Sequence, residues 1–152
     1  MRFEQTRTIL KKLAPDYHRA VSRFYQHLAD GEVSPRVRLM LDYLIDHEQH
    51  RALALKEFCE EAPSQSLDYW HKGLELEFPL ADAAILGENA RTDLDSLLCA
   101  AINYKKILFN YFDHLLEKCD DQKASDLFLA LKNQEEKAMK RMIRHAQGLA
   151  DL

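Results

Sequence analysis

Apolar side chains recur every three or four residues through most of this chain, in four long segments. That spacing places the apolar positions on one face of an α-helix. Glycine or proline residues separate the segments at two of their borders. The pattern predicts an all-α protein with helices at about 3–29, 34–62, 92–119 and 121–149, and with a connection at 63–91.

Several residues predict where these helices begin or bend. Pro15 predicts a kink in the first helix, or a short lead-in helix followed by a new start, because proline lacks an amide hydrogen. Ser34 is a suitable N-cap for the second helix, and Thr92 for the third. Asp120 or Asp121 is expected to start the fourth helix.

The connection at 63–91 differs from the rest of the chain. It has two prolines and two glycines, together with the aromatic residues Tyr69, Trp70 and Phe78, and it lacks a long helical period. So much apolar surface is typical of an ordered segment, and Trp70 and His71 could form a lid or a subunit contact. One long connection between two short ones predicts two helical hairpins joined by a crossover along a bundle.

The length of 152 residues predicts one domain, 1–152, with a core of its own. The net charge of -4 gives no support for binding to nucleic acid or to an anionic membrane. No apolar run approaches the ~20 residues of a membrane span, and no apolar signal segment opens the chain. Cys59, Cys99 and Cys119 are without paired spacing, which predicts reduced thiols in a cytoplasmic protein.

Four ionisable residues lie on or beside the predicted apolar stripes, one in each helix. His18 lies 29 residues before His47, and Lys105 lies 30 residues before Glu135. Burying such groups costs several kcal/mol unless they are paired or bind a metal. Their similar placement therefore predicts a polar centre inside the helical bundle.

The second-helix segment LIDHEQHRAL (44–53) and the fourth-helix segment NQEEKA (133–138) carry a family resemblance. With the repeated Tyr-His-Arg (17–19) and Tyr-Lys-Lys (104–106), they make residues ~4 to 149 resemble the rubrerythrin-like branch of the ferritin-like superfamily. The resemblance implies a four-helix bundle with a single crossover. Di-iron members of this superfamily use Glu, Glu-x-x-His, Glu and Glu-x-x-His on their successive helices.

Most of these ligands are replaced in this chain. His18 and Lys105 stand at the positions of the first-helix and third-helix glutamates. His47-x-x-His50 keeps the histidine of the second motif and loses its glutamate, whereas Glu135-x-x-Ala138 keeps the glutamate and loses the histidine. A standard di-iron centre cannot form from this set.

Two neighbouring glutamates do not supply the missing ligands when the helices are aligned in this register. Glu48 and Glu136 lie one position beyond His47 and Glu135, about 100° around their helices, and are therefore expected to point away from the centre.

Two interpretations of the centre remain open. In the first, His18, His47, His50 and Glu135 hold one transition metal ion (iron, zinc or manganese), and the Lys105 ammonium replaces the second ion. In the second, no metal binds, and a Lys-Glu pair with hydrogen-bonded histidines remains in a structural or protein-interaction module. The protein is expected to be a homodimer in either case. The sequence assigns no reaction, because no intact ferroxidase or peroxidase motif is found, although single-metal redox activity stays open.

Overall fold

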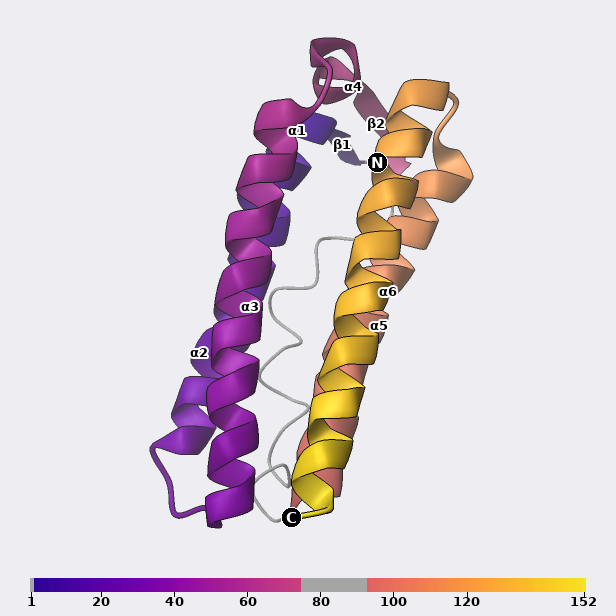
Figure 1. Ribbon diagram of the computed structural model, residues 1–152. Coiled ribbons are helices and arrows are strands. Elements are labelled where there is room, and N and C mark those ends of the chain that lie inside the picture. Colours follow the sequence, from indigo (N-terminus) through magenta and orange to yellow (C-terminus); the bar gives the residue numbers. More distant parts are fainter. Residues whose placement is uncertain (1, 75–92) are drawn as a thin grey trace.

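The computed structural model describes residues 2–74 and 93–152. It contains four long helices, which are arranged as two antiparallel pairs (Figure 1). The first pair is α2 (Ala14–Ala29) and α3 (Pro35–Glu61), and the second is α5 (Leu94–Lys118) and α6 (Gln122–Ala150). In Figure 1, α5 begins at the end of the bundle opposite to the end where α3 stops. The predicted all-α bundle with four long helices is confirmed.

The start of the chain differs from the predicted helix at 3–29. Residues Arg2–Gln5 form the strand β1, which pairs in antiparallel fashion with β2 (Trp70–Leu74). The amide of Thr6 also donates a hydrogen bond to the carbonyl oxygen of Tyr69, at 3.0 Å. The first residues therefore form a strand because they pair with a distant segment, although their apolar spacing is helical. The first helix begins at α1 (Thr6–Thr8).

The turn before Pro15 explains how the first helix passes this proline without a break. Residues Ile9–Leu13 form a π-helical segment, η1, and the amide of Ala14 donates to the carbonyl oxygen of Ile9, five residues earlier. A proline ring crowds the carbonyl four residues before it and donates no hydrogen bond. The wider π turn accommodates both effects, and α2 continues from it.

Side-chain caps define the starts of the other long helices. Ser34 Oγ accepts a hydrogen bond from the Val37 amide at 3.2 Å, and an Asp121 carboxylate oxygen accepts one from the Ala124 amide at 2.9 Å, as predicted. The third long helix is capped by Asp93, whose Oδ1 accepts from the Ser96 amide at 2.7 Å. The cap predicted at Thr92 lies outside the described residues.

The connection between the hairpins is described up to Leu74. It contains the short helix α4 (Ser64–Asp68) and then β2. The rest of the predicted crossover, Phe78 included, lies outside the described residues. None of the helices in the described part of the chain is both long enough and apolar enough to cross a membrane.

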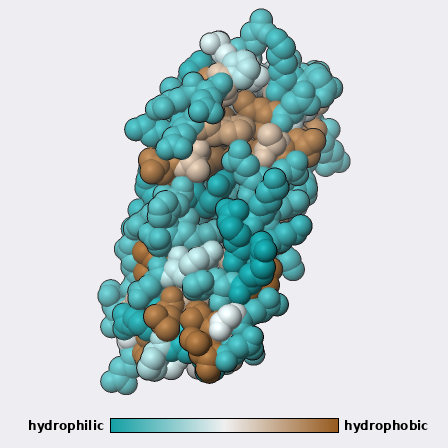
Figure 2. Space-filling view, in the orientation of Figure 1, coloured by the Kyte–Doolittle hydropathy of each residue, from teal (hydrophilic) through white to brown (hydrophobic). Residues whose placement is uncertain are grey.

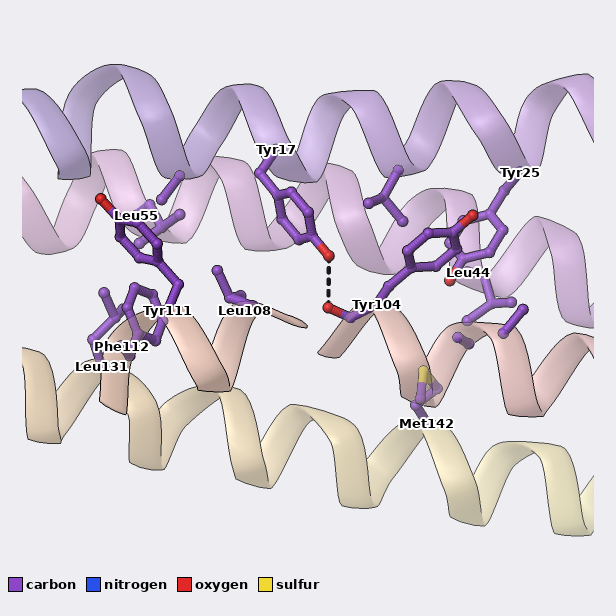
Figure 3. Close-up of a cluster of buried hydrophobic side chains, with 14 of the residues drawn as sticks. Tyr17, Tyr25, Leu44, Leu55, Tyr104, Leu108, Tyr111, Phe112, Leu131 and Met142 are labelled. Carbon is purple, nitrogen blue, oxygen red and sulfur yellow. Dashed lines mark hydrogen bonds between the residues drawn. The ribbon is translucent and has the colours of Figure 1, made fainter. Parts of the chain in front are cut away.

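Aromatic side chains from α2 and α5 meet inside the bundle (Figure 3). The Tyr17 hydroxyl donates a hydrogen bond to the carbonyl oxygen of Tyr104 at 2.6 Å, and the rings of Tyr25 and Tyr104 pack edge to face, 5.8 Å apart. Leucines and Met142 fill the space around these rings. Such packed layers lie on both sides of the polar centre along the bundle, because on α6 the buried Leu131 precedes Glu135 and Met142 follows it.

Candidate functional site: a buried ring of ion pairs

Each long helix contributes one almost fully buried ionisable side chain to the centre of the bundle. These residues are His18 from α2, Glu48 from α3, Lys105 from α5 and Glu135 from α6, and each is at most 2% exposed. Basic and acidic groups alternate from helix to helix along the chain. We call these four residues the ion ring.

Close contacts join each member of the ion ring to its two neighbours. His18 Nδ1 lies 2.5 Å from Glu48 Oε2, and Glu48 Oε1 lies 3.1 Å from Lys105 Nζ. Lys105 Nζ donates to Glu135 Oε2 at 3.2 Å. Glu135 Oε1 lies 3.3 Å from His18 Nε2, an ion-pair distance without the alignment of a hydrogen bond. The ion pair between His18 and Glu135 therefore closes the ring.

Arg51 adds a further cation outside the ion ring. Its Nε donates to Glu135 Oε1 at 2.7 Å, and its side chain is 10% exposed. Glu48 and Arg51 are three residues apart, so both point from the same face of α3 toward the centre. Glu135 thus contacts three basic groups, from three other helices.

Both carboxylates of the ion ring are held in their ionised form. Burial alone raises the pKa of Glu48, but the nearby Lys105 and His18 lower it more strongly, to about 2. The pKa of Glu135 is likewise raised by burial and then brought well below its ordinary value by Lys105, His18 and Arg51. At neutral pH, both side chains carry a negative charge.

The pKa values of the two basic members of the ion ring, His18 and Lys105, are raised. Burial lowers the pKa of His18 and of Lys105, but Glu135 and Glu48 raise it more, so that both pKa values lie above their ordinary values. Protonation of His18 gives the centre three cations, with Lys105 and Arg51, against two carboxylates. The centre then carries one net positive charge.

The predicted site residues divide into two groups. The structure brings His18, Lys105 and Glu135 together. His50 lies at the surface instead, with its side chain 70% exposed and its Nδ1 2.8 Å from the carbonyl oxygen of Asp46. His47 is half-buried and stacks on Tyr43, with the ring centroids 5.8 Å apart.

Glu48 corrects the expected register of α3. It was expected to point away from the centre, and this is wrong, because the buried face runs through Leu44, Glu48, Arg51 and Leu55. Glu136, by contrast, is half-buried and outside the ion ring. One signal in the sequence indicates the observed register: Glu48 follows His18 by 30 residues, as Glu135 follows Lys105 by 30.

As arranged here, these residues do not fit the predicted metal site. Both nitrogens of the His18 ring face carboxylates, and Lys105 and Arg51 already contact the carboxylates that would bind a metal ion. Within residues 2–74 and 93–152, no group of three or more His, Cys, Asp or Glu side chains is placed to hold a metal ion. The single-metal site stays a prediction.

Comparisons with family models, with curated proteins and with solved structures find no match to this chain.

Proposed function

We propose that this chain is a metal-independent scaffold of the ferritin-like type, with a structural or protein-interaction role. The observation that carries the proposal is the position of Lys105, whose ammonium lies 3.1 Å from Glu48 and 3.2 Å from Glu135. An ammonium between two buried carboxylates, together with His18 and Arg51, balances their charge without a metal ion. The ion ring then replaces the metal centre of the bundle.

The register of the ion ring supports the ferritin-like relationship. With Glu48 facing inward, Glu48-x-x-Arg51 stands where the superfamily has Glu-x-x-His, and Glu135-x-x-Ala138 stands at the second such position. The carboxylates of the second and fourth long helices, α3 and α6, are retained. His18 and Lys105 replace the other two, which turns a ring of ligands into a ring of ion pairs.

A ring of this kind acts on the structure of the bundle. Each of the four helices supplies one member, so a slip of any helix along its axis would leave buried charges without partners. An unpaired buried charge costs about 3–5 kcal/mol. We infer that the ion ring fixes the relative register of the helices, and that binding to partners takes place on the outer surface.

Elemental analysis tests the proposal. Untagged protein from metal-replete medium is analysed before and after washing with chelator, and its helix content is followed by circular dichroism. We expect well below one equivalent of transition metal per chain, with the fold unchanged by the wash. A tightly held equivalent of metal, whose removal unfolds the protein, would refute metal independence.

A single-metal site is the second candidate, and one observation favours it. His18 Nε2 and Glu135 Oε1 are 3.3 Å apart, which is close enough for both atoms to bind one ion with bond lengths of about 2 Å. The variant His47→Ala, His50→Ala separates the candidates. If stoichiometric metal is found and is lost in this variant, the single-metal site is supported instead.

The expected homodimer is part of the proposal, and light scattering on the full chain tests it. A mass of twice 17.7 kDa is the expected result, and a monomer at micromolar concentration would contradict it.

A further inference from the structure

A surface cleft of about 420 Å³ lies beside the ion ring, and the proposed function does not use it. Residues of α3 form most of its lining, and Arg141 contributes from α6. Figure 2 shows the face formed by α3 and α6, where hydrophilic side chains gather across the middle and hydrophobic patches lie nearer the ends. The cleft lies on this face, between α3 and α6.

Arg51 connects this cleft with the centre of the bundle. Its Nε is bound to Glu135, and the same side chain lines the cleft. In the described part of the chain, Nη2 of Arg51 is buried without a hydrogen-bond partner. Buried guanidinium hydrogens are rarely left without an acceptor, so this group indicates a missing anionic or polar partner.

His47 lines the same cleft and also has a buried nitrogen without a partner among the described residues. This nitrogen is Nε2. Its ring is held by stacking on Tyr43, which in turn stacks on His145 with centroids 4.0 Å apart. Two fixed, unsatisfied nitrogens thus belong to side chains of one cleft.

The charges around the cleft disfavour an anion of high charge. The centre behind Arg51 has three cations and two carboxylates when His18 is protonated, and the exposed Arg141 adds a cation at the rim. Asp46 and Glu57 also line the cleft, and they would repel a dianion, such as the doubly charged form of phosphate, more strongly than a monoanion. With His18 protonated, four cations and four carboxylates lie in and behind the cleft, so a monoanion is the largest negative charge that we expect it to hold.

The remaining lining indicates an organic ligand. Tyr43, Leu53 and Ala54 give the cleft an apolar side next to its basic side chains. An arginine fork matches the planar geometry of a carboxylate, and an apolar wall suits a short carbon chain. We propose that this cleft binds the carboxylate group of a small organic acid, through Arg51 with His47 and Arg141.

NMR titration of the full chain with propionate tests the proposal, at neutral pH and constant ionic strength. We expect saturable shifts of amide signals near residues 43–57 and 141. Affinity should fall by about tenfold or more in Arg51→Gln, because a charge-assisted bond to the ligand is lost. Arg141→Gln should also weaken binding, whereas Arg144→Gln should not, because Arg144 is also exposed on α6 but lies outside the cleft.

Three results would overturn the proposal. One is a linear, non-saturating response to propionate, and another is equal weakening by Arg141→Gln and Arg144→Gln, which would indicate general charge effects. The third is tighter binding of inorganic phosphate than of propionate. If Arg51→Gln does not fold, His47→Gln and Arg141→Gln carry the same comparison against Arg144→Gln.

Discussion

The ammonium of Lys105 lies 3.1 Å from the carboxylate of Glu48, and neither side chain is more than 2% exposed. They belong to α5 and α3, one from each hairpin of the bundle. Together with the contact between His18 and Glu135, this ion pair joins the two hairpins through charge. The following predictions concern what this arrangement contributes.

Replacing Lys105 by methionine should destabilise the protein strongly. The change keeps the length of the side chain but leaves Glu48 and Glu135 with one fewer buried cation. We expect the free energy of unfolding to fall by about 3–5 kcal/mol, measured by urea denaturation. Lys106→Met is the matched control, because Lys106 is exposed on the same helix. A loss below about 1 kcal/mol in Lys105→Met would mean that the ion ring contributes little.

A double-mutant cycle should show that Lys105 and Glu48 act together. Glu48→Gln and Lys105→Met are combined, and the loss in the double variant should be smaller than the sum of the single losses by about 1–3 kcal/mol. The reference pair is Lys132 and Asp113, whose side chains are 22% and 54% exposed. Its coupling should stay below about 1 kcal/mol. Equal coupling in the two cycles would contradict a special role for the buried pair.

Acid should destabilise the protein through two histidines outside the ion ring. Burial lowers the pKa of His47 and of His71 to about 4, from an ordinary value of 6.5. Between these values the unfolded chain binds protons that the folded chain does not, so the free energy of unfolding falls as pH decreases from 6.5 to 4. Urea denaturation at several pH values measures this slope. His47→Gln should reduce it, and an unchanged slope would count against the assigned burial.

His18 should have the opposite effect on the pH dependence of stability. Its folded pKa is raised above 6.5, so its contribution to stability is fully present below pH 6.5 and is lost as pH rises through the folded pKa. This contribution partly offsets the loss from His47 and His71 at acid pH. The His18→Gln variant should therefore show a steeper fall in stability on acidification than the unmodified chain.

Ser34 should contribute to stability by capping α3. Its hydroxyl oxygen accepts the otherwise free amide hydrogen of Val37. Ser34→Ala should cost about 1 kcal/mol of unfolding free energy by urea denaturation, whereas Ser34→Asp, which preserves an acceptor, should cost less. Equal losses in the two variants would show that the cap is not what stabilises this helix end.

The sequence predicts the four long helices because their causes are local. Apolar spacing sets the buried faces, and Ser34 and Asp121 cap the helices from within the same turn. The strand pair was missed because it depends on contacts between distant segments: Gln5 pairs with Trp70. A strand of four residues has little pattern of its own from which this pairing could be predicted.

The candidate site could be predicted in part. His18, Lys105 and Glu135 interrupt apolar stripes, and such interruptions are visible in a sequence. Glu48 was missed because the register of the second helix was fixed on the family histidine at His47. One residue turns a helix by about 100°, so this choice placed the carboxylate outside and His50 inside. The sequence did not indicate that Arg51 contacts the centre, because an arginine at the edge of an apolar stripe usually extends to the solvent.

Metal independence is the central claim, and metal-linked stability tests it most directly. Unfolding free energies are measured in chelator and then with manganese, iron(II) or zinc added in excess. A metal at 100 times its dissociation constant would stabilise the folded chain by about 2.7 kcal/mol. We predict equal free energies in chelator and in each metal, because Lys105, His18 and Arg51 already balance the charge of Glu48 and Glu135. A stabilisation of this size by any of the metals, lost in His18→Ala, would contradict the account.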